Sequence, residues 1–181
     1  VASPSAAFTA APLSGTVPLT VTFTDHSTGE VTSWLWNLDD GNTSTARHPT
    51  HTYTRTGSFT ASLTVSGPGG SNTVTKTNYI QVLHPAPTAD FSATPISGSV
   101  PLFVQFTDHS SGVITSWQWE FGDGNVSRLQ NPSYTYQSAR PYTVTLSIAG
   151  PGGSDQRIKP RYVTAIEKIY RIYLPIVTKS P

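Results

Sequence analysis

Residues 57–66, GSFTASLTVS, alternate strictly between apolar and small polar side chains. In an extended chain the apolar side chains share one face, and they are Phe59, Ala61, Leu63 and Val65. A period of two residues is typical of a β-strand that buries one face. The sequence GPGGS follows directly, and glycine-rich segments of this kind form tight hairpin turns. A β-hairpin is therefore predicted here.

The region around this hairpin occurs twice in the chain. Residues 6–71 return as residues 89–154 without a gap, a shift of 83 positions, and close to half of the positions are identical. Such internal repetition indicates two copies of one structural unit, and the proline-bearing stretch between them should be a semi-rigid linker. The predicted segments are a first domain at residues 1–83, a linker at 84–88, a second domain at 89–166 and a C-terminal tail at 167–181.

Other segments of the repeat show the same alternation. In PLTVTFT, Leu19, Val21 and Phe23 share one face, and TSWLWNL places Trp34 and Trp36 together. Strands that are apolar on one face need a second sheet to cover that face. We therefore expect an all-β fold in which each unit is a small β-sandwich of about seven strands. Most aromatic side chains should point inward, and the tryptophans should supply much of the core.

One longer pattern resembles that of a known family. In the second unit, WQWEFGDGN at residues 117–125 is followed by a proline, a TYT segment and the alternating TVTLSIAGPGGS. This pattern resembles that of PKD domains, which are immunoglobulin-like β-sandwiches. The first unit departs from it with Leu38 in place of Phe and Asp39 in place of Gly, which bears on the turn and not on the fold. The resemblance covers residues 6–166 and implies two tandem sandwiches of a kind that accompanies secreted chitinases, collagenases and proteases.

Composition and charge exclude several classes of protein. The 181 residues carry a net charge of +1, which gives no electrostatic argument for nucleic-acid binding. The absence of Cys excludes disulfides and thiolate chemistry. No apolar run approaches the roughly 20 residues that span a bilayer. The opening VASPSAAF is typical of the start of a processed secreted chain, so we expect an extracellular or cell-surface protein.

Both units carry carboxylates and amides in the loop that follows the tryptophan segment. Oxygen atoms of these groups are the ligands that Ca²⁺ prefers, so calcium is the one cofactor that the sequence leaves open. A tight turn explains the same residues, because Asp-Gly and Gly-Asn pairs readily adopt positive φ. We favour the turn. The candidate calcium ligands are Asp39, Asp40, Asn42, Asp123 and Asn125.

Asp25, His26 and Ser27 have the residue types of a hydrolase triad, and the same three residues return in the second unit. Contiguous residues of an extended chain point to alternating faces and cannot form the triad geometry, so local bonds to the backbone are expected instead. His48 and His51 are expected to be surface histidines rather than metal ligands. With no catalytic group to nominate, we expect a protein that is not an enzyme.

Two glycosylation sequons occupy equivalent positions in the two units. They begin at Asn42 and Asn125, in the predicted turn, where an attached sugar would reach solvent.

The tail ends in RIYLPIVTKSP, which has no counterpart after the first unit. It is apolar at alternate positions, and a lone strand of this kind must pair with the edge of a sheet. Three destinations remain open: the sheet of the next molecule, the tail's own second domain, and a different partner or a cell wall. We favour the first, which would build a head-to-tail filament. The candidate assembly residues are Tyr170, Ile172, Tyr173, Leu174, Ile176 and Val177.

Taken together, these observations favour a non-enzymatic extracellular structural or surface protein that assembles through its tail into a filament or a surface layer. The alternative is an accessory module of a secreted hydrolase or adhesin that binds carbohydrate or protein. The expected partners are a second copy of this chain, a cell-surface or matrix protein, or a polysaccharide. Neither a nucleic-acid partner nor a membrane-spanning segment is expected.

Overall fold

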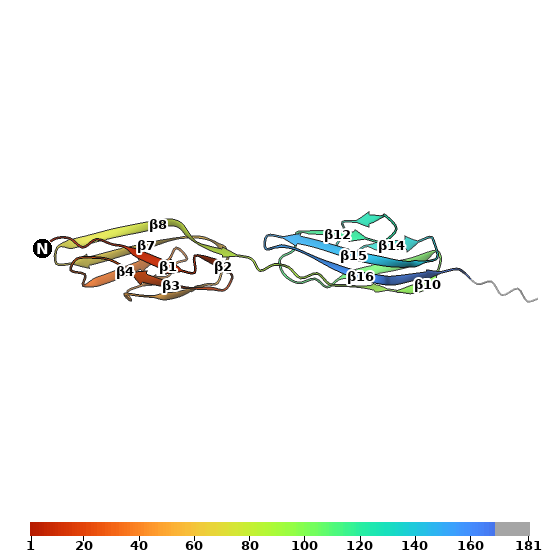
Figure 1. The fold of residues 1–181 in the computed structure, drawn as a ribbon, viewed down its shortest axis with the longest axis horizontal. Coiled ribbons are helices and arrows are strands. Elements are labelled where there is room, and N and C mark those ends of the chain that lie inside the picture. Colours follow the sequence, from red (N-terminus) through yellow and green to blue (C-terminus); the bar gives the residue numbers. More distant parts are fainter. Residues whose placement is uncertain (169–181) are drawn as a thin grey trace, which may run out of the picture. The chain divides into compact units, whose positions relative to one another are not determined.

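The chain forms two compact units, and the second begins at Ala86. The computed structural model describes residues 1–168 (Figure 1). These residues contain strands, turns and loops but no helix, so the all-β expectation is confirmed. Accordingly, no helix within residues 1–168 is long and apolar enough to cross a membrane.

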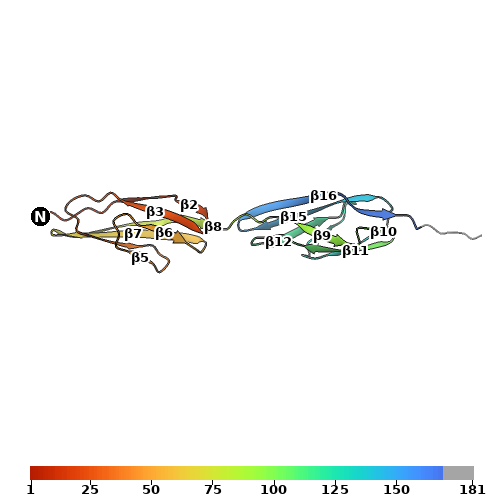
Figure 2. The same cartoon turned by 90° about the horizontal axis from the view of Figure 1, so that it is seen from below.

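The first unit is a sandwich of a three-stranded and a five-stranded sheet. One sheet has the order β1-β3-β6 and the other β2-β8-β7-β4-β5, and all neighbours are antiparallel except β2 and β8 (Figures 1 and 2). The strands are β1 (Phe8–Ala11), β2 (Ser14–Thr16), β3 (Leu19–Asp25), β4 (Ser33–Asn37), β5 (Thr43–Ser44), β6 (Thr50–Tyr53), β7 (Gly57–Gly67) and β8 (Gly70–Leu83). The unit has one strand more than expected, because its first strand is divided between the two sheets.

The second unit repeats this topology. Its sheets have the orders β9-β11-β14 and β10-β16-β15-β12-β13. The strands are β9 (Phe91–Thr94), β10 (Ser97–Ser99), β11 (Leu102–Asp108), β12 (Ser116–Glu120), β13 (Val126–Ser127), β14 (Ser133–Tyr136), β15 (Pro141–Gly150) and β16 (Gly153–Ile166). The expectation of two tandem immunoglobulin-like sandwiches is thus confirmed.

The core of each unit lies between its two sheets and is built around one tryptophan. Trp36 and Trp119 are fully buried, and an edge of each ring meets Phe8 or Phe91 with ring centroids 5.1 Å apart in both units. The predicted inward face of β7 is buried throughout. Burial of side chains of this size stabilises the fold by about 1.5–3 kcal/mol each.

The expectation that aromatic side chains point inward fails at one strand. Phe103 follows the buried Leu102 on β11, so it lies on the outer face of the sheet and is 60% exposed. The first unit has Thr20 at the equivalent position. The error has a simple cause, because an aromatic residue at an out-of-phase position cannot turn inward without disrupting the strand.

A lysine joins the two sheets at one side of each sandwich. Lys76, on β8 of the five-stranded sheet, donates through Nζ to the carbonyl oxygen of Phe8, on β1 of the other sheet. The same ammonium lies 4.9 Å from the ring centroid of Phe8 and 4.6 Å from that of Tyr79. Lys159 occupies the equivalent place in the second unit and contacts Phe91 and Tyr162. Each sandwich is therefore closed on this side by a cation–π contact as well as by a hydrogen bond.

Candidate functional site

Asp25, the first residue of the apparent triad, forms a junction between strands in the first unit, because its carboxylate is bonded to several segments. Asp25 is buried at the end of β3, where Oδ1 accepts a hydrogen bond from the Ser27 amide at 2.8 Å. Oδ2 accepts bonds from the indole of Trp34 at 3.0 Å and from Nε of Arg47 at 3.1 Å. Burial acts to raise the pKa of Asp25, but the bonds that its carboxylate accepts outweigh burial and lower the pKa. The carboxylate is therefore held ionised between the two sheets.

The other members of the apparent triad make separate contacts. His26 Nε2 lies 3.0 Å from the hydroxyl of Thr9, and the Ser27 hydroxyl contacts the backbone of Ala7. The three side chains do not converge, as expected for contiguous residues near the end of a strand.

The second unit repeats this junction with one substitution. Asp108 accepts from the Ser110 amide at 2.9 Å, from the indole of Trp117 at 2.7 Å and from Nε2 of Gln130 at 3.1 Å. Gln130 stands where the first unit has Arg47. Because a neutral amide replaces the guanidinium without altering the other bonds, the role of the junction is to join strands.

The loop of the first unit is a tight turn. Asp39 has a positive φ of 65°, and its Oδ2 accepts a bond from the Thr60 amide at 2.8 Å. Asp40 accepts from the Asn42 amide through Oδ1, and its Oδ2 lies 2.6 Å from Nε2 of His51. The carboxylates of the candidate calcium ligands are thus occupied by bonds within the turn. Calcium binding at these residues stays a prediction.

The equivalent loop of the second unit uses a tyrosine in place of the histidine. Gly122 takes the place of Asp39 with a φ of 86°. The Tyr134 hydroxyl donates to Oδ2 of Asp123 at 2.6 Å, and the side-chain Nδ2 of Asn125 donates to the same hydroxyl at 2.7 Å. Burial and the bond to Asp123 raise the pKa of Tyr134 to about 12. The two units therefore reach the same turn with different chemistry.

The two histidines behave differently from each other. His48 is exposed, as expected, and its Nδ1 accepts from the Asp25 amide at 3.1 Å. The expectation was wrong for His51, whose side chain is only 15% exposed because it packs against Tyr53 and pairs with Asp40. In the described part of the chain, no group of three or more His, Cys, Asp or Glu residues could hold a metal ion.

Both sequon asparagines are exposed in the turn. The side-chain nitrogen of Asn125, to which a glycan would be attached, donates to Tyr134. Glycosylation of Asn42 and Asn125 stays a prediction.

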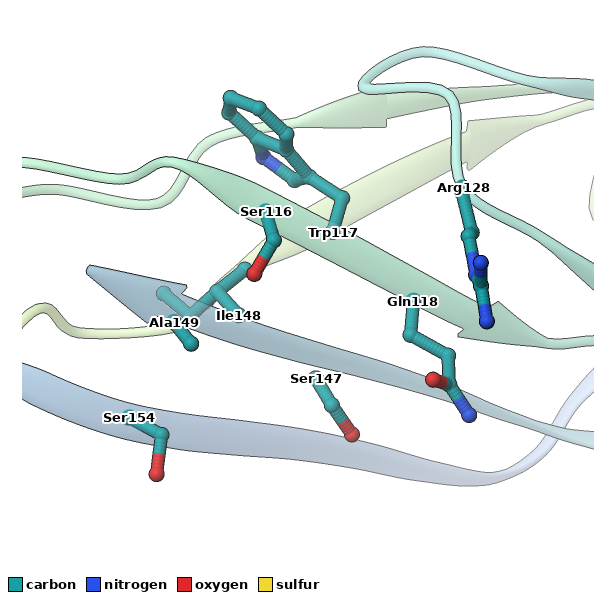
Figure 3. Close-up of a pocket in the computed structure, with 8 residues that line it drawn as sticks. All are labelled: Ser116, Trp117, Gln118, Arg128, Ser147, Ile148, Ala149 and Ser154. Atoms are coloured by element: carbon teal, nitrogen blue, oxygen red, sulfur yellow. The ribbon is translucent and has the colours of Figure 1, made fainter.

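The second unit has two hollows on the outer face of its five-stranded sheet. The larger has a volume of about 420 Å³ and lies over β12, β15 and β16 (Figure 3). Its polar lining consists of Ser116, Gln118, Arg128, Ser147 and Ser154. A smaller hollow of about 260 Å³ lies at the other end of β12, beside Glu120 and Val126. Sequence reasoning missed both, although Gln118 and Arg128 differ from Leu35 and Thr45 of the first unit.

All six candidate assembly residues lie outside the described residues, and they are Tyr170, Ile172, Tyr173, Leu174, Ile176 and Val177. Assembly through them stays a prediction.

A comparison with family models matches this chain twice. The model described as "PKD domain" matches residues 2–82 and again residues 84–165. The two matches correspond to the two units and include both aspartate junctions and both turns.

Among curated proteins, two proteases contain similar regions. The pre-pro-metalloprotease PrtV of Vibrio cholerae is 29% identical over 129 residues, which cover 71% of this chain and 14% of that protein. The collagenase ColA of Bacillus cereus is 40% identical over 70 residues, which cover 36% of this chain and 7% of that protein. The chain therefore spans a small part of the proteases that it matches.

Among solved structures, an amphioxus IgVJ-C2 molecule is similar to this chain with a TM-score of 0.53. The sequences are 16% identical, and the match covers 83% of this chain and 99% of that one. This likeness concerns the fold alone, and it agrees with two immunoglobulin-like sandwiches in tandem.

Proposed function

The chain belongs to the PKD domain family, and from this premise we propose that it is a non-catalytic accessory part of an extracellular protein. Its two sandwiches would bind a protein or matrix partner. The observation that carries this proposal is the shared use of polar residues in the two units. Asp25 and Asp108 accept equivalent bonds from a tryptophan, and Asp40 and Asp123 accept equivalent bonds within a turn. Groups that could otherwise perform acid–base chemistry therefore serve the fold.

The names of the relatives suggest the class of partner. One relative is named a metalloprotease and the other a collagenase. In each of them the matching region is a small part of the protein, as suits an accessory module. A fibrous extracellular protein is therefore the partner class that we propose, with an insoluble polysaccharide as the competing class.

Co-sedimentation tests this proposal. The intact chain would be mixed with insoluble collagen, with cellulose and with chitin, and the amount in each pellet would be compared with that of the heat-unfolded chain. We expect retention by the protein fibre and not by the polysaccharides. Retention by a polysaccharide alone would replace the proposed partner class, and no retention on any support would contradict the accessory binding function.

Self-assembly through the tail is a second candidate function. The observation in its favour is the alternation of apolar residues at Tyr170, Ile172, Leu174 and Ile176. Negative-stain electron microscopy of the full chain beside a chain that ends at Ala165 would test it. Filaments that form only with the full chain would support assembly, and monomers in both samples would remove this candidate.

A further inference from the structure

We propose that the outer face of the five-stranded sheet in the second unit binds an extended peptide segment, with Arg128 binding an acidic side chain of that peptide. This inference rests on the proposed function, because it gives the protein partner a site and a recognition chemistry. The first unit has the same fold but carries Leu35 and Thr45 at the positions of Gln118 and Arg128.

The site has a defined place in the fold. The larger hollow is lined by side chains from the three adjacent strands β12, β15 and β16, together with Arg128, which follows β13 (Figure 3). Ser116 and Ser154 contribute hydroxyl groups, and Gln118 contributes an amide. The lining is therefore rich in groups that can both donate and accept hydrogen bonds, as the main chain of a peptide requires.

Arg128 brings an unpaired positive charge to the larger hollow. Its side chain is exposed, and no hydrogen bond or ion pair joins the guanidinium to any other group within residues 1–168. Arg47 shows the contrast, because its Nε is bonded to Asp25 at 3.1 Å. A planar guanidinium offers paired donors that match the two oxygens of a carboxylate. Charge complementarity therefore favours an acidic ligand at Arg128.

The two units differ where the ligand would lie. Subtracting the shift of 83 positions from Gln118, Val126, Arg128 and Ile158 gives Leu35, Thr43, Thr45 and Thr75 of the first unit. In the second unit, valine, arginine and isoleucine thus replace threonine at three positions, and an amide replaces leucine at the fourth. The strands themselves keep the same register, so these differences change the surface and not the fold.

The second hollow extends the site along β12. It begins at Glu120, two residues beyond Gln118, and includes Val126, which is 60% exposed. Ile158, on the same sheet, is 52% exposed. Two residues of an extended chain span about 7 Å. The face therefore suits a peptide that has an acidic residue and an apolar residue two positions apart. Glu120 would repel a second acidic residue at the smaller hollow.

A polysaccharide fits this face less well. Sugar rings stack on exposed aromatic faces, and the one aromatic residue in the lining, Trp117, is half-buried and directs its indole N–H to Asp108. The hydroxyl, amide and guanidinium groups instead match a peptide with a carboxylate. An anionic polysaccharide also carries carboxylates that Arg128 could bind, so it is the competing ligand in the experiment below.

The test is a titration of the intact, ¹⁵N-labelled chain followed by two-dimensional NMR. The probe is an acetylated and amidated peptide ASESVSA, and its matched control is ASQSVSA, which lacks the charge. We expect the first peptide to shift the amide signals of β12 and β15, and the second to bind about tenfold more weakly. Equal binding of the two peptides, or no shifts with either, would overturn the proposal.

Two substitutions localise the effect. R128A should weaken binding of ASESVSA about tenfold, whereas R55A, which removes the same charge from an exposed residue of the first unit, should leave it unchanged. The double substitution L35Q/T45R should create peptide-dependent shifts in β4 and β7. Equal effects of R128A and R55A would reduce the interaction to net charge and contradict the site.

A third ligand and the sedimentation assay separate the remaining outcomes. A hexamer of galacturonic acid that shifts the same signals while ASESVSA does not would assign the face to an anionic polysaccharide and overturn the peptide proposal. If R128A abolishes peptide binding but the wild-type chain is not retained on collagen, the site stands and the proposed partner class fails. If R128A is retained on collagen as well as the wild type, the site fails as the route to that partner.

Discussion

At the scale of single residues, the turn after the tryptophan segment shows how two side-chain sets produce one backbone conformation. Asp39 adopts a positive φ of 65° and its carboxylate bonds to the Thr60 amide, whereas Gly122 adopts a φ of 86° with no side chain. A Cβ atom built on Gly122 would lie 2.4 Å from the carbonyl oxygen of Thr143. The glycine is therefore required by close packing as well as by its φ.

This difference gives a prediction about Gly122. Replacing Gly122 by Ala should destabilise the second unit by about 2–4 kcal/mol. The cost of an alanine at positive φ adds to the cost of its Cβ packing too closely against the Thr143 carbonyl. Gly122→Asp should cost less, because the carboxylate can accept a bond from the Thr143 amide as Asp39 does from Thr60. Urea unfolding of the intact chain would measure both.

Gly124→Ala is the matched control for that experiment. Gly124 also has a positive φ, of 94°, but a Cβ there would meet nothing within 4 Å. Its substitution should cost about 1–2 kcal/mol, from strain alone. Equal costs at the two glycines would show that packing against Thr143 contributes nothing.

A second prediction at this scale concerns acid. Partial burial acts to raise the pKa of Asp40, but its bonds with His51 and Asn42 outweigh burial and hold the pKa below the usual value of 3.8. A carboxyl whose folded pKa is depressed contributes stability above its unfolded pKa and loses that contribution as the pH falls through the folded pKa. The first unit should therefore become less stable below about pH 4, and Asp40→Asn should reduce this dependence.

Two-dimensional NMR spectra of the intact chain in moderate urea, recorded from pH 6 to pH 2.5, would follow the two units separately. Asp123, whose pKa is also lowered, provides the comparison, since Asp123→Asn should change the acid response of the second unit only. An unchanged acid response of the first unit in Asp40→Asn would contradict the role of the Asp40 bonds.

At the scale of strands, the aspartate junctions join the two layers of each sandwich. Asp25 ends β3 of the three-stranded sheet and is bonded to Trp34 on β4 of the five-stranded sheet. Lys76 makes a second link between the sheets, through Phe8. These bonds fix how the strands of one sheet lie over those of the other, which the hydrophobic core alone does not specify.

Removing a junction should therefore be costly. Asp25→Ala leaves the Ser27 amide and the Trp34 indole without their acceptor, and we expect a loss of about 2–4 kcal/mol in the free energy of unfolding. Asp25→Asn should cost less, because the amide oxygen still accepts. Arg47→Ala is the control: the Arg47 side chain is 59% exposed, so its removal should cost less than about 1 kcal/mol. Thermal and urea unfolding would rank the three variants.

The strands were predictable from sequence to the extent that their side chains alternate. The inward faces of β3 and β7 followed directly from the period of two, and the hairpin turn between β7 and β8 followed from the glycine-rich GPGGS. The aspartate junctions could not be predicted, because Asp25 and Arg47 are 22 positions apart and no local pattern relates them. The hollow beside Arg128 could not be predicted either, because its lining comes from four separate segments that are brought together only by the order of the strands in the sheet.

At the scale of the whole molecule, each unit has a hydrophobic core of its own. The cluster of the first unit includes residues from Phe8 to Val82, and that of the second includes residues from Ala89 to Ala165, with no residue shared between them. Tandem units with separate cores behave as independent domains.

We therefore expect residues 1–85 and 86–168 to fold as separate chains. Each should give the NMR signal dispersion and the cooperative unfolding of a native β-sandwich. A fragment that stays unfolded alone but folds in the intact chain would show that its stability depends on its neighbour.

The parallel pairing of β2 with β8 has a mechanical consequence. Ser14, Gly15 and Thr16 are aligned with Gln81, Val82 and Leu83, so β2, the second strand of the unit, runs parallel to β8, its last strand. Tension applied through the two ends of the unit would slide these strands past each other and load their hydrogen bonds in shear, all at once rather than one by one. A sandwich connected in this way should resist pulling, a property that would suit the attachment to a fibre proposed above.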